Sequence, residues 1–523
     1  MISKNMQYAG LGILVLIGAV CGLMYSINQD LNSDSVVPGL VAKEIFENGN
    51  FQFFYPANDP YTFTDIITFH LIPQVISGYD PLALKITAYV MFLLAVIIFS
   101  YIVYRYSGTL NALIFAALAL NISYAAYKNY ITPEFHVGTI IMAGLLFLIF
   151  EPMSIKKGLS LRTISGIVLT ALIVYSDSII IATFVVPYII VYALFYRKKQ
   201  DARDLPVGLM ALFGFATLIS KSMFFNDLVK TGASFADPAH VLTINLPYII
   251  KGMSILTNQG LYNILEGTVN PIDIVLAILT IMLLYIASIR AVDVLRTIKQ
   301  ANKIKGKGKE KEKEERMEAN YPLLFFVTSI VTVIGAFTLV NLITDIGSAR
   351  FLTFTVTSIF ALIALLYKDD MSDRVNAASA GIIAVLIIST IFANVLMISS
   401  MDFNPNQDEY EFIGYLKANN VTYAYSNFAH ANVISYLSQD EVIVRPVFVY
   451  QDRFVLFPWL VTTKWYSEES LHGPYAVIVD NSDAPIKGSC NVLPKEHVER
   501  LFHEYPVDEI LEYKDRTIYI YRE

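Results

Sequence analysis

The chain has 523 residues, of which 55% are apolar and only 16% are charged, and its formal net charge is −7. Soluble domains average roughly 45–50% apolar and about 25% charged residues, so the composition argues against an ordinary water-soluble globular protein. Two cysteines cannot form a disulfide framework, no ligand spacing for structural zinc is present, and the negative charge disfavours nucleic acid as a partner.

Apolar runs of about 17–25 residues can cross a bilayer as helices, and the sequence contains eleven candidates for such spans. The first follows Lys4 but lacks a small-residue cleavage site at its end, so we interpret it as an uncleaved anchor. The eleven candidates lie at 8–26, 86–104, 109–123, 136–152, 161–175, 178–196, 205–223, 271–290, 321–343, 351–367 and 378–399.

The distribution of basic residues predicts the orientation of a multi-pass protein in the plasma membrane. With the N-terminus in the cytoplasm, 21 of the 38 Lys and Arg residues lie in inner segments and only seven in the outer loops. An odd number of spans then places the C-terminal region outside, together with long outer loops at 27–85 and 224–270. The charged run at 303–316, inside a loop at 296–318, is expected to be a disordered cytoplasmic linker, with a lipid or protein contact as the alternative.

Residues 401–523 are expected to form a small extracytoplasmic α/β domain after a transmembrane domain at 1–400. Short apolar runs that favour strands alternate there with segments of helical pattern. No phosphate-binding loop, nucleophile motif or metal-ligand set occurs in this region, so a lid or scaffold is favoured over an independent enzyme. The expected strands are 421–426, 441–450, 475–480 and 517–522, and the expected helices are 408–418 and 495–505.

Asp34 follows the first apolar run by a few residues and precedes an amphipathic segment. The spacing of Val37, Leu40, Val41 and Ile45 predicts a helix lying on the membrane surface. Asp34 can be explained as a helix cap or as a reactive carboxylate, and the two roles are compatible.

Other costly polar residues also fall in the predicted outer segments. Charged groups near a bilayer mark function more often than stability, and their grouping on one side favours a single outward-facing site. Each has a structural alternative, namely an interfacial helix start, a polar turn, or an arginine reaching the interface. These residues are Asp30, Lys43, Tyr61 and Asp65 in the first outer loop, Lys128, Glu134 and His136 before the fourth span, Asp177 in a short hairpin, and Arg350 at the start of the tenth span.

The sequence resembles the GT-C superfamily of polytopic glycosyltransferases, in the branch that uses polyprenyl-phosphate sugars and includes protein O-mannosyltransferases and lipid A aminoarabinose transferases. The resemblance rests on the anchor followed by NSDSVVPGLVAKEI, on FFYPANDPYTFTD, and on the shorter PEFH, YSDS and ARFL segments. It implies that Asp34 is the catalytic base and that Arg350 binds the donor phosphate. Ser35 stands where mannosyltransferases commonly have a second acidic residue, so a mannosyl donor is not implied.

The expected activity is inverting transfer of a hexosyl or pentosyl group from a polyprenyl-phosphate donor to a glycan, lipid or protein acceptor outside the membrane. Lys43 and Lys128 are further candidates for the phosphate. Sugar or acceptor contacts are expected from Asp30, Tyr61, Asp65, Glu134, His136 and Asp177. Such a reaction requires no metal, although Asp30, Asp34, Glu134 and His136 would form a divalent-cation site if the fold brought them together.

Two other classes of function remain open at this point. A transporter or flippase would have a similar number of spans, but its polar residues should gather near the midplane of the membrane and in paired repeats. A non-catalytic envelope assembly protein would not need Asp34 or Arg350. The sugar, the acceptor, the length of the carrier lipid and the oligomeric state are not encoded in any motif that we identify.

Overall fold

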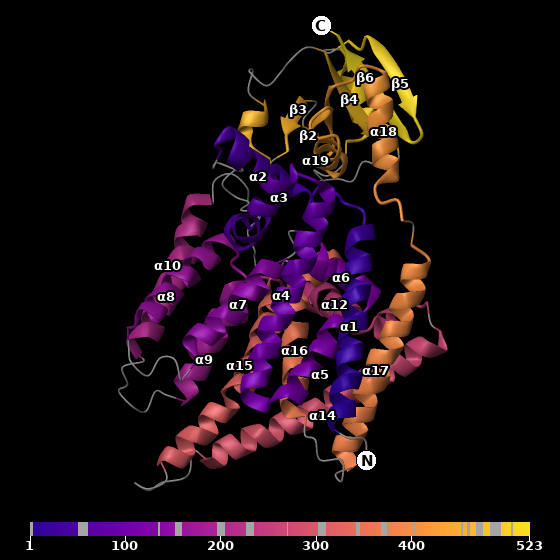
Figure 1. Cartoon of the computed structure of the whole chain (residues 1–523). Coiled ribbons are helices and arrows are strands. Elements are labelled where there is room, and N and C mark those ends of the chain that lie inside the picture. The colour runs from indigo at the N-terminus through magenta and orange to yellow at the C-terminus, as the bar shows by residue number, and fades with distance from the viewer. Residues whose placement is uncertain are drawn as a thin grey trace. The chain divides into compact units, whose positions relative to one another are not determined.

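The computed structural model of the chain consists mainly of helices, with one small mixed sheet near the C-terminus (Figure 1). It describes residues 4–50, 61–133, 136–151, 159–195, 204–225, 235–268, 270–301, 310–340, 346–367, 374–401, 403–450, 453–457, 461–466, 474–481, 493–503 and 506–522.

The contacts divide the chain into two compact units, which we call the helical unit and the sheet unit. The helical unit comprises Met1–Ser26, Tyr89–Met223 and Thr231–Met401. The sheet unit comprises Ile27–Ala88, Phe224–Lys230 and Asp402–Glu523. The segment that follows the first apolar helix therefore makes its contacts with the C-terminal residues, although almost the whole helical unit separates the two segments in sequence.

Seven described helices are long and apolar enough to cross a membrane, which identifies a multi-pass membrane protein. An eighth is added if α5 (Thr109–Leu120) and α6 (Tyr124–Ile131), which are bent by 97°, form one broken span. The seven are α1 (Lys4–Asn28), α4 (Pro81–Ser107), α11 to α12 (Pro238–Thr257), Pro271–Ile289 of α14 (Pro271–Ala301), Asn320–Leu339 of α15 (Glu310–Leu339), η4 with α16 (Ile346–Leu366) and α17 (Arg374–Ser399).

All eleven predicted spans coincide with helices, but four of these helices are shorter than a full span. The four short apolar helices are α7 (Val137–Phe150), α8 (Leu161–Ser176), the pair η2 and α9 (Ile181–Leu194), and Leu205–Ser220 of α10 (Asp204–Phe225).

The predicted outer loop at 224–270 contains an apolar helix that was not among the predicted spans. The stretch Pro238–Thr257 is continuous helix, made of α11 (Pro238–His240), η3 (Val241–Asn245) and α12 (Leu246–Thr257). Its mean hydropathy of 1.2 is the lowest of the seven because polar residues interrupt the apolar run. Helix α12 packs closely on η4 (Ile346–Leu352), where a Cβ atom added at Gly252 would lie 3.2 Å from the Ala349 Cβ.

The whole charged run at 303–316 was expected to be disordered, but the residues from Glu310 onward form the first turns of α15. This expectation was therefore wrong for 310–316, and residues 302–309 lie outside the described part of the chain. Glu and Lys three or four residues apart attract one another along a helix, which favours helix over coil in such a sequence.

The sheet unit contains a six-stranded sheet with the order β3-β2-β1-β4-β6-β5. Strands β1, β2 and β4 are parallel, whereas β3, β5 and β6 pair in antiparallel fashion. All four predicted strands are confirmed, and two short strands, β3 and β5, were not predicted. The strands are β1 (Tyr423–Ser426), β2 (Ile443–Tyr450), β3 (Arg453–Leu456), β4 (Tyr475–Asp480), β5 (Glu509–Tyr513) and β6 (Arg516–Tyr521).

Helices cover the sheet, and its side chains alternate between two apolar cores. In β4, Ile478 packs into one core and Val477 and Val479 into the other, as the two-residue period of a strand requires. The helices of this unit are α2 (Val37–Asn48), α3 (Leu71–Ser77), α18 (Gln407–Ala418), α19 (Phe428–Leu437) and α20 (Lys495–Glu499).

The predicted amphipathic helix is present as α2, but its apolar face packs against protein. Val37, Val41 and Ile45 form a cluster with Ile66 of the π-helical segment η1 (Thr62–His70), and Leu40 belongs to the core beneath the sheet. The expectation that these side chains rest on the membrane surface was therefore wrong, because residues distant in sequence cover them.

Candidate functional site

Asp34 lies in a tight turn that two neighbouring side chains close. The Ser35 backbone N–H donates to Asn32 Oδ1 at 2.9 Å, and the Ser35 hydroxyl donates to the Asn32 carbonyl at 2.9 Å. The N-cap position of α2 is occupied by Val36, so Asp34 lies two residues before the cap. The side chain of Asp34 is partly exposed and extends from a well-defined turn.

The turn is attached to α19 by the residue before Asp34. The Ser33 hydroxyl donates to the Ala429 carbonyl at 3.0 Å and accepts from the Val433 N–H at 3.4 Å. Further along α2, a Cβ atom added at Gly39 would lie 2.3 Å from the Tyr436 ring, so only glycine permits this approach. These contacts hold the Asp34 turn in a defined position within the sheet unit.

Asp30 and Lys43, two other predicted site residues, bind partners near the sheet. The Asp30 carboxylate accepts a hydrogen bond from the Asn406 backbone N–H at 2.7 Å. Lys43 Nζ lies 2.5 Å from Asp440 Oδ2, and its ammonium is 5.7 Å from the centroid of the Tyr79 ring. Both residues therefore join the first outer segment to the C-terminal residues.

Tyr61 and Asp65 lie at the start of the π-helical segment η1. Tyr61 precedes the segment with a left-handed φ of 55°, which is uncommon for an aromatic residue. Asp65 is buried and accepts a hydrogen bond from the Thr64 hydroxyl at 2.8 Å. At the end of the segment, burial lowers the pKa of the His70 imidazole to about 3, so this ring is neutral at physiological pH.

His136 and Asp177 form a buried pair in the helical unit. Asp177 ends α8 in the predicted short hairpin, and its Oδ2 lies 2.7 Å from His136 Nδ1. The same oxygen accepts from the Thr139 hydroxyl at 2.6 Å, while Oδ1 accepts from the Ile179 N–H at 3.1 Å. His136 has a left-handed φ of 61°, a strained conformation of the kind that is frequent at functional sites.

Replacing Asp177 by Ala is expected to lower the melting temperature of the protein by several degrees. Breaking a buried pair costs about 3–5 kcal/mol, because the remaining partner loses its hydrogen bonds away from water. Thermal unfolding in detergent measures the effect, and Ser178→Ala, an exposed neighbour, should leave the melting temperature unchanged.

The stabilisation by Asp177 should also depend on pH. Burial alone would raise the pKa of its carboxyl, but His136 and the hydrogen bonds from Thr139 and Ile179 lower it below its ordinary value. The contribution is therefore complete above the ordinary pKa near 4 and is lost as the pH falls through the lower folded-state pKa. A difference in melting temperature between wild type and Asp177→Ala that did not shrink in acid would contradict this.

Arg350 lies in the same unit and is linked to His136 through an aromatic residue. The guanidinium carbon of Arg350 is 5.2 Å from the centroid of the Phe351 ring. The centroid of the His136 ring also lies 5.2 Å from that of the Phe351 ring. The Phe337 ring stacks on the Phe351 ring, with centroids 5.3 Å apart. The structure thus gathers three predicted site residues, His136, Asp177 and Arg350, into one cluster with Phe351.

Two further predicted residues are Lys128 and Glu134. Lys128 lies in the last turn of α6, and its side chain is exposed. Glu134 lies outside the residues that the structure describes.

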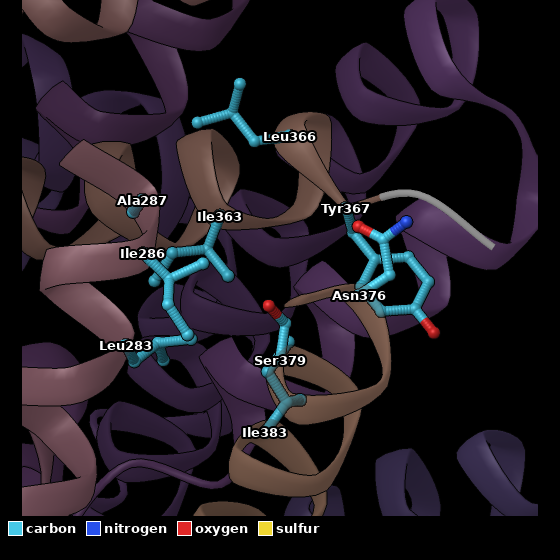
Figure 2. Close-up of a pocket in the computed structure, with 9 residues that line it drawn as sticks. All are labelled: Leu283, Ile286, Ala287, Ile363, Leu366, Tyr367, Asn376, Ser379 and Ile383. Atoms are coloured by element: carbon cyan, nitrogen blue, oxygen red, sulfur yellow. The ribbon is translucent and has the colours of Figure 1, made fainter. Parts of the chain in front are cut away.

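Two small apolar cavities border α16 (Thr353–Leu366), the helix that follows Arg350 and Phe351. They share Leu283 of α14 and Ile363 of α16, and we call them together the apolar groove. Figure 2 shows the first cavity, where Ile363 faces Leu283 and Ile286, and Asn376 and Ser379 supply polar atoms. Ile363 lies ten residues into α16, about 15 Å along the helix axis.

Helix α12 connects the same two regions. It packs on η4 through Gly252, and its last residues, together with Asn258, line the second cavity. Both α12 and α16 therefore run from the segment that carries Arg350 to the groove.

Within the described residues, no group of three or more His, Cys, Asp or Glu side chains could hold a metal ion. Asp30 and Asp34 belong to the sheet unit, whereas His136 belongs to the helical unit. The structure therefore does not assemble the divalent-cation site considered from the sequence among the residues it describes.

Several solved structures of low sequence identity align with the chain. ArnT from Cupriavidus metallidurans, bound to undecaprenyl phosphate, aligns with a TM-score of 0.49 and 9% identity over 98% of each chain. The Archaeoglobus fulgidus oligosaccharyltransferase in complex with zinc and sulfate aligns with a TM-score of 0.48 and 11% identity, over 90% of this chain and 68% of that one. No protein-family model and no curated protein matches the chain.

The archaeal oligosaccharyltransferase AglB from Archaeoglobus fulgidus, in complex with an inhibitory peptide and a dolichol-phosphate, aligns with a TM-score of 0.48 and 11% identity, over 92% of this chain and 70% of that one. The roles of individual residues must be argued from the chain itself.

Sequence reasoning missed three residues that shape these sites. Thr139 shares the Asp177 carboxylate, Phe351 joins His136 to Arg350, and Ser33 attaches the Asp34 turn to α19. Phe351 and Ser33 are direct neighbours of predicted residues, and Thr139 follows His136 by one helical turn, but nothing in the sequence distinguishes them from ordinary helix or turn residues.

Proposed function

We propose that the protein is a membrane glycosyltransferase that moves a sugar from a polyprenyl-phosphate donor to an acceptor on the outer face of the membrane. The observation that carries the proposal is the cluster of Arg350, Phe351, His136 and Asp177 at the start of α16, on the helix that borders the apolar groove from Ile359 onward. A cation and an apolar groove along one helix suit a ligand with an anionic head and a long hydrocarbon chain. A polyprenyl phosphate has this combination.

In this proposal Arg350 binds the phosphate of the donor. Guanidinium groups stay charged and donate two parallel hydrogen bonds to phosphate oxygens, and they stabilise the charge that grows on a leaving phosphate. Lys43 is a weaker candidate because its ammonium is already paired with Asp440. Lys128 is exposed and not linked to the cluster, so it also ranks below Arg350.

Asp34 acts as the general base. Its carboxylate removes the proton from an acceptor hydroxyl while the oxygen attacks the anomeric carbon, and the bond from that carbon to the phosphate oxygen breaks. Attack opposite to the leaving phosphate inverts the configuration of the sugar. The fixed turn around Asp34 supports this role, because a base must be held within hydrogen-bonding distance of the proton that it removes.

The His136–Asp177 pair is proposed to bind hydroxyl groups of the donor sugar. Nδ1 of His136 lies 2.7 Å from Oδ2 of Asp177, and this contact orients the imidazole ring. Inversion at a monophosphate donor does not require a metal. A hexosyl and a pentosyl donor both satisfy this scheme.

The direct test of the activity is mass spectrometry of surface glycans from cells that lack the protein. One sugar should be missing from a glycan, lipid or protein, and the wild-type gene should restore it. An unchanged set of glycans would favour the transporter or assembly alternatives.

A bulky side chain in the groove should impair the use of long-chain donors. Ile363→Trp is expected to raise the KM for a long polyprenyl-phosphate sugar about tenfold, equivalent to 1.4 kcal/mol of binding, because the indole would occupy the space of the chain. Ile278→Trp on the exposed face of α14 is the control. Equal KM values for the two variants, or an equal effect on a short-chain donor, would contradict the placement of the chain.

The proposed orientation places the N-terminus in the cytoplasm and the sheet unit outside. In a background with Cys21→Ser and Cys490→Ser, Ala418→Cys at the end of α18 should react with an impermeant maleimide in intact cells. Lys307→Cys should react only after the cells are broken. The reverse pattern of labelling would invert the proposed topology.

A further inference from the structure

The order of the strands creates a recognised kind of binding position in the sheet unit. After β1 the chain passes through α19 and returns as β2 on one side of β1, while β4 pairs in parallel on the other side. The connections therefore leave β1 and β4 in opposite directions. In open α/β sheets, ligands bind outside the carboxyl ends of the strands at such a switch point.

Two chemically active side chains meet at this switch point. His430 in the first turn of α19 places Nε2 3.3 Å from Oδ2 of Asp480, the last residue of β4. The relative solvent exposure is 17% for the His430 side chain and 14% for the Asp480 side chain, so both are accessible to a solute. Beneath them the Ser426 hydroxyl donates to the Ile478 carbonyl at 3.0 Å and joins the two strands.

The neighbouring residue Phe428 fixes this turn of α19 in place. Its ring stacks on that of Phe457, with centroids 4.8 Å apart, and packs against the cluster of Val37, Val41, Ile45 and Ile66. A carboxylate and an imidazole held side by side provide an acceptor and a donor. The neighbouring hydroxyl groups of a sugar ring can bind such a pair.

Two apolar cores hold the strands of the sheet together, so the His430–Asp480 pair is not their main source of stability. A functional role accounts better for a His–Asp pair at this particular edge.

The switch point is also the place where the Asp34 turn is attached. Ser33 binds the carbonyl of Ala429, the residue directly before His430, and the N–H of Val433. Asp34 therefore follows a residue that is bonded to the same turn of α19.

We propose that the edge formed by His430 and Asp480 is a sugar-binding site that holds the acceptor and presents its hydroxyl to Asp34. The acceptor role rests on the proposed function, whereas the binding of a sugar does not. The class of ligand is a pyranose ring carrying free hydroxyls, as part of an acceptor glycan. His430 and Asp480 are positioning residues and take no proton in the transfer.

Saturation-transfer NMR on the full chain in nanodiscs tests the proposal, with the methyl pyranosides of glucose, galactose, mannose and N-acetylglucosamine as probes. At least one should receive saturation, and His430→Ala and Asp480→Asn should each weaken its binding at least tenfold. His497→Ala is the matched control and should bind as wild type does. Thermal melting within a few degrees of wild type verifies that the variants are folded.

Asp34→Asn separates this proposal from the proposed function, because it should bind the pyranoside as wild type does while losing transfer. If Asp34→Asn kept both binding and transfer, the function would fail while the sugar site stood. If no pyranoside received saturation, or if binding survived in both His430→Ala and Asp480→Asn, the sugar site would be refuted.

Discussion

Asp34→Asn should abolish sugar transfer, with a fall in kcat of about 10²–10⁴, the usual contribution of a general base. Asparagine has nearly the same shape as aspartate but cannot accept the proton of an acceptor hydroxyl. The turn should persist, because the bonds between Asn32 and Ser35 and those from Ser33 to α19 do not involve the Asp34 carboxylate. Membrane insertion and melting temperature should therefore match wild type.

Transfer is measured by complementing a deletion strain and quantifying the glycan by mass spectrometry. Asp508→Asn is the matched control, because Asp508 is exposed and only caps the backbone N–H of Arg522 in this unit. Asp34→Glu should retain a small part of the activity, since its carboxylate is displaced by one methylene. A normal amount of glycan in Asp34→Asn would remove Asp34 from the catalytic role.

Arg350→Ala should reduce transfer by about 10²–10³, the effect of removing one strong donor to the charge of a transition state. The loss should appear in both kcat and KM, because the phosphate is anionic in the bound donor and gains charge as it leaves. Arg350→Lys should recover part of the activity, since it keeps the charge but loses the planar pair of donors.

The same glycan measurement applies, together with donor binding by the purified protein. Arg374→Ala, at the exposed start of α17, removes the same charge from the helical unit and should be neutral. Transfer by Arg350→Ala at more than a tenth of the wild-type rate would contradict phosphate binding by Arg350. Equal loss in Arg350→Ala and Arg374→Ala would indicate a general effect of charge.

Comparing Asp34→Asn with Arg350→Ala tests whether the two residues have the separate roles proposed for them. Loss of donor binding in Arg350→Ala with retention in Asp34→Asn is the expected pattern, because only one of the two residues contacts the donor phosphate. The reverse pattern would exchange their roles.

Much of the architecture follows from local sequence because the relevant signals are short in range. Apolar runs without charge must satisfy their backbone hydrogen bonds internally in lipid, which makes them helices wherever they pack. Alternating apolar residues in YAVIVD must present two faces, and β4 presents them to two cores. The helix after Asp34 follows in the same way from the spacing of Val37, Leu40, Val41 and Ile45.

The pairings between distant residues could not be read from these patterns. Asp177 meets His136 across 41 positions, and Lys43 meets Asp440 across 397. A spacing of apolar residues shows that a helix has a face to bury, but not whether lipid or protein will cover it. The apolar face of α2 is covered by residues of η1 and α19. The expectation that it lies on the membrane surface was wrong for that reason.

The low mean hydropathy of Pro238–Thr257 shows that a whole apolar helix can be missed when its polar residues have distant partners. Asn245 of η3 and Lys251 of α12 interrupt the apolar run of Pro238–Thr257. The Asn245 amide finds partners in the Thr338 and Val340 carbonyls only once the chain has folded. A polar residue is tolerated inside such a helix when distant backbone groups satisfy it.

Composition and local pattern thus decided that this chain is a helical membrane protein with a small C-terminal α/β domain, and the family resemblance singled out Asp34 and Arg350. Only the tertiary structure decided that His136, Asp177 and Arg350 share one cluster, that the first outer segment belongs with the C-terminal sheet, and that His430 faces Asp480. The physical reason is that backbone hydrogen bonding and burial of apolar faces act within a few residues. The partner of a polar side chain depends on where the chain returns after hundreds of residues.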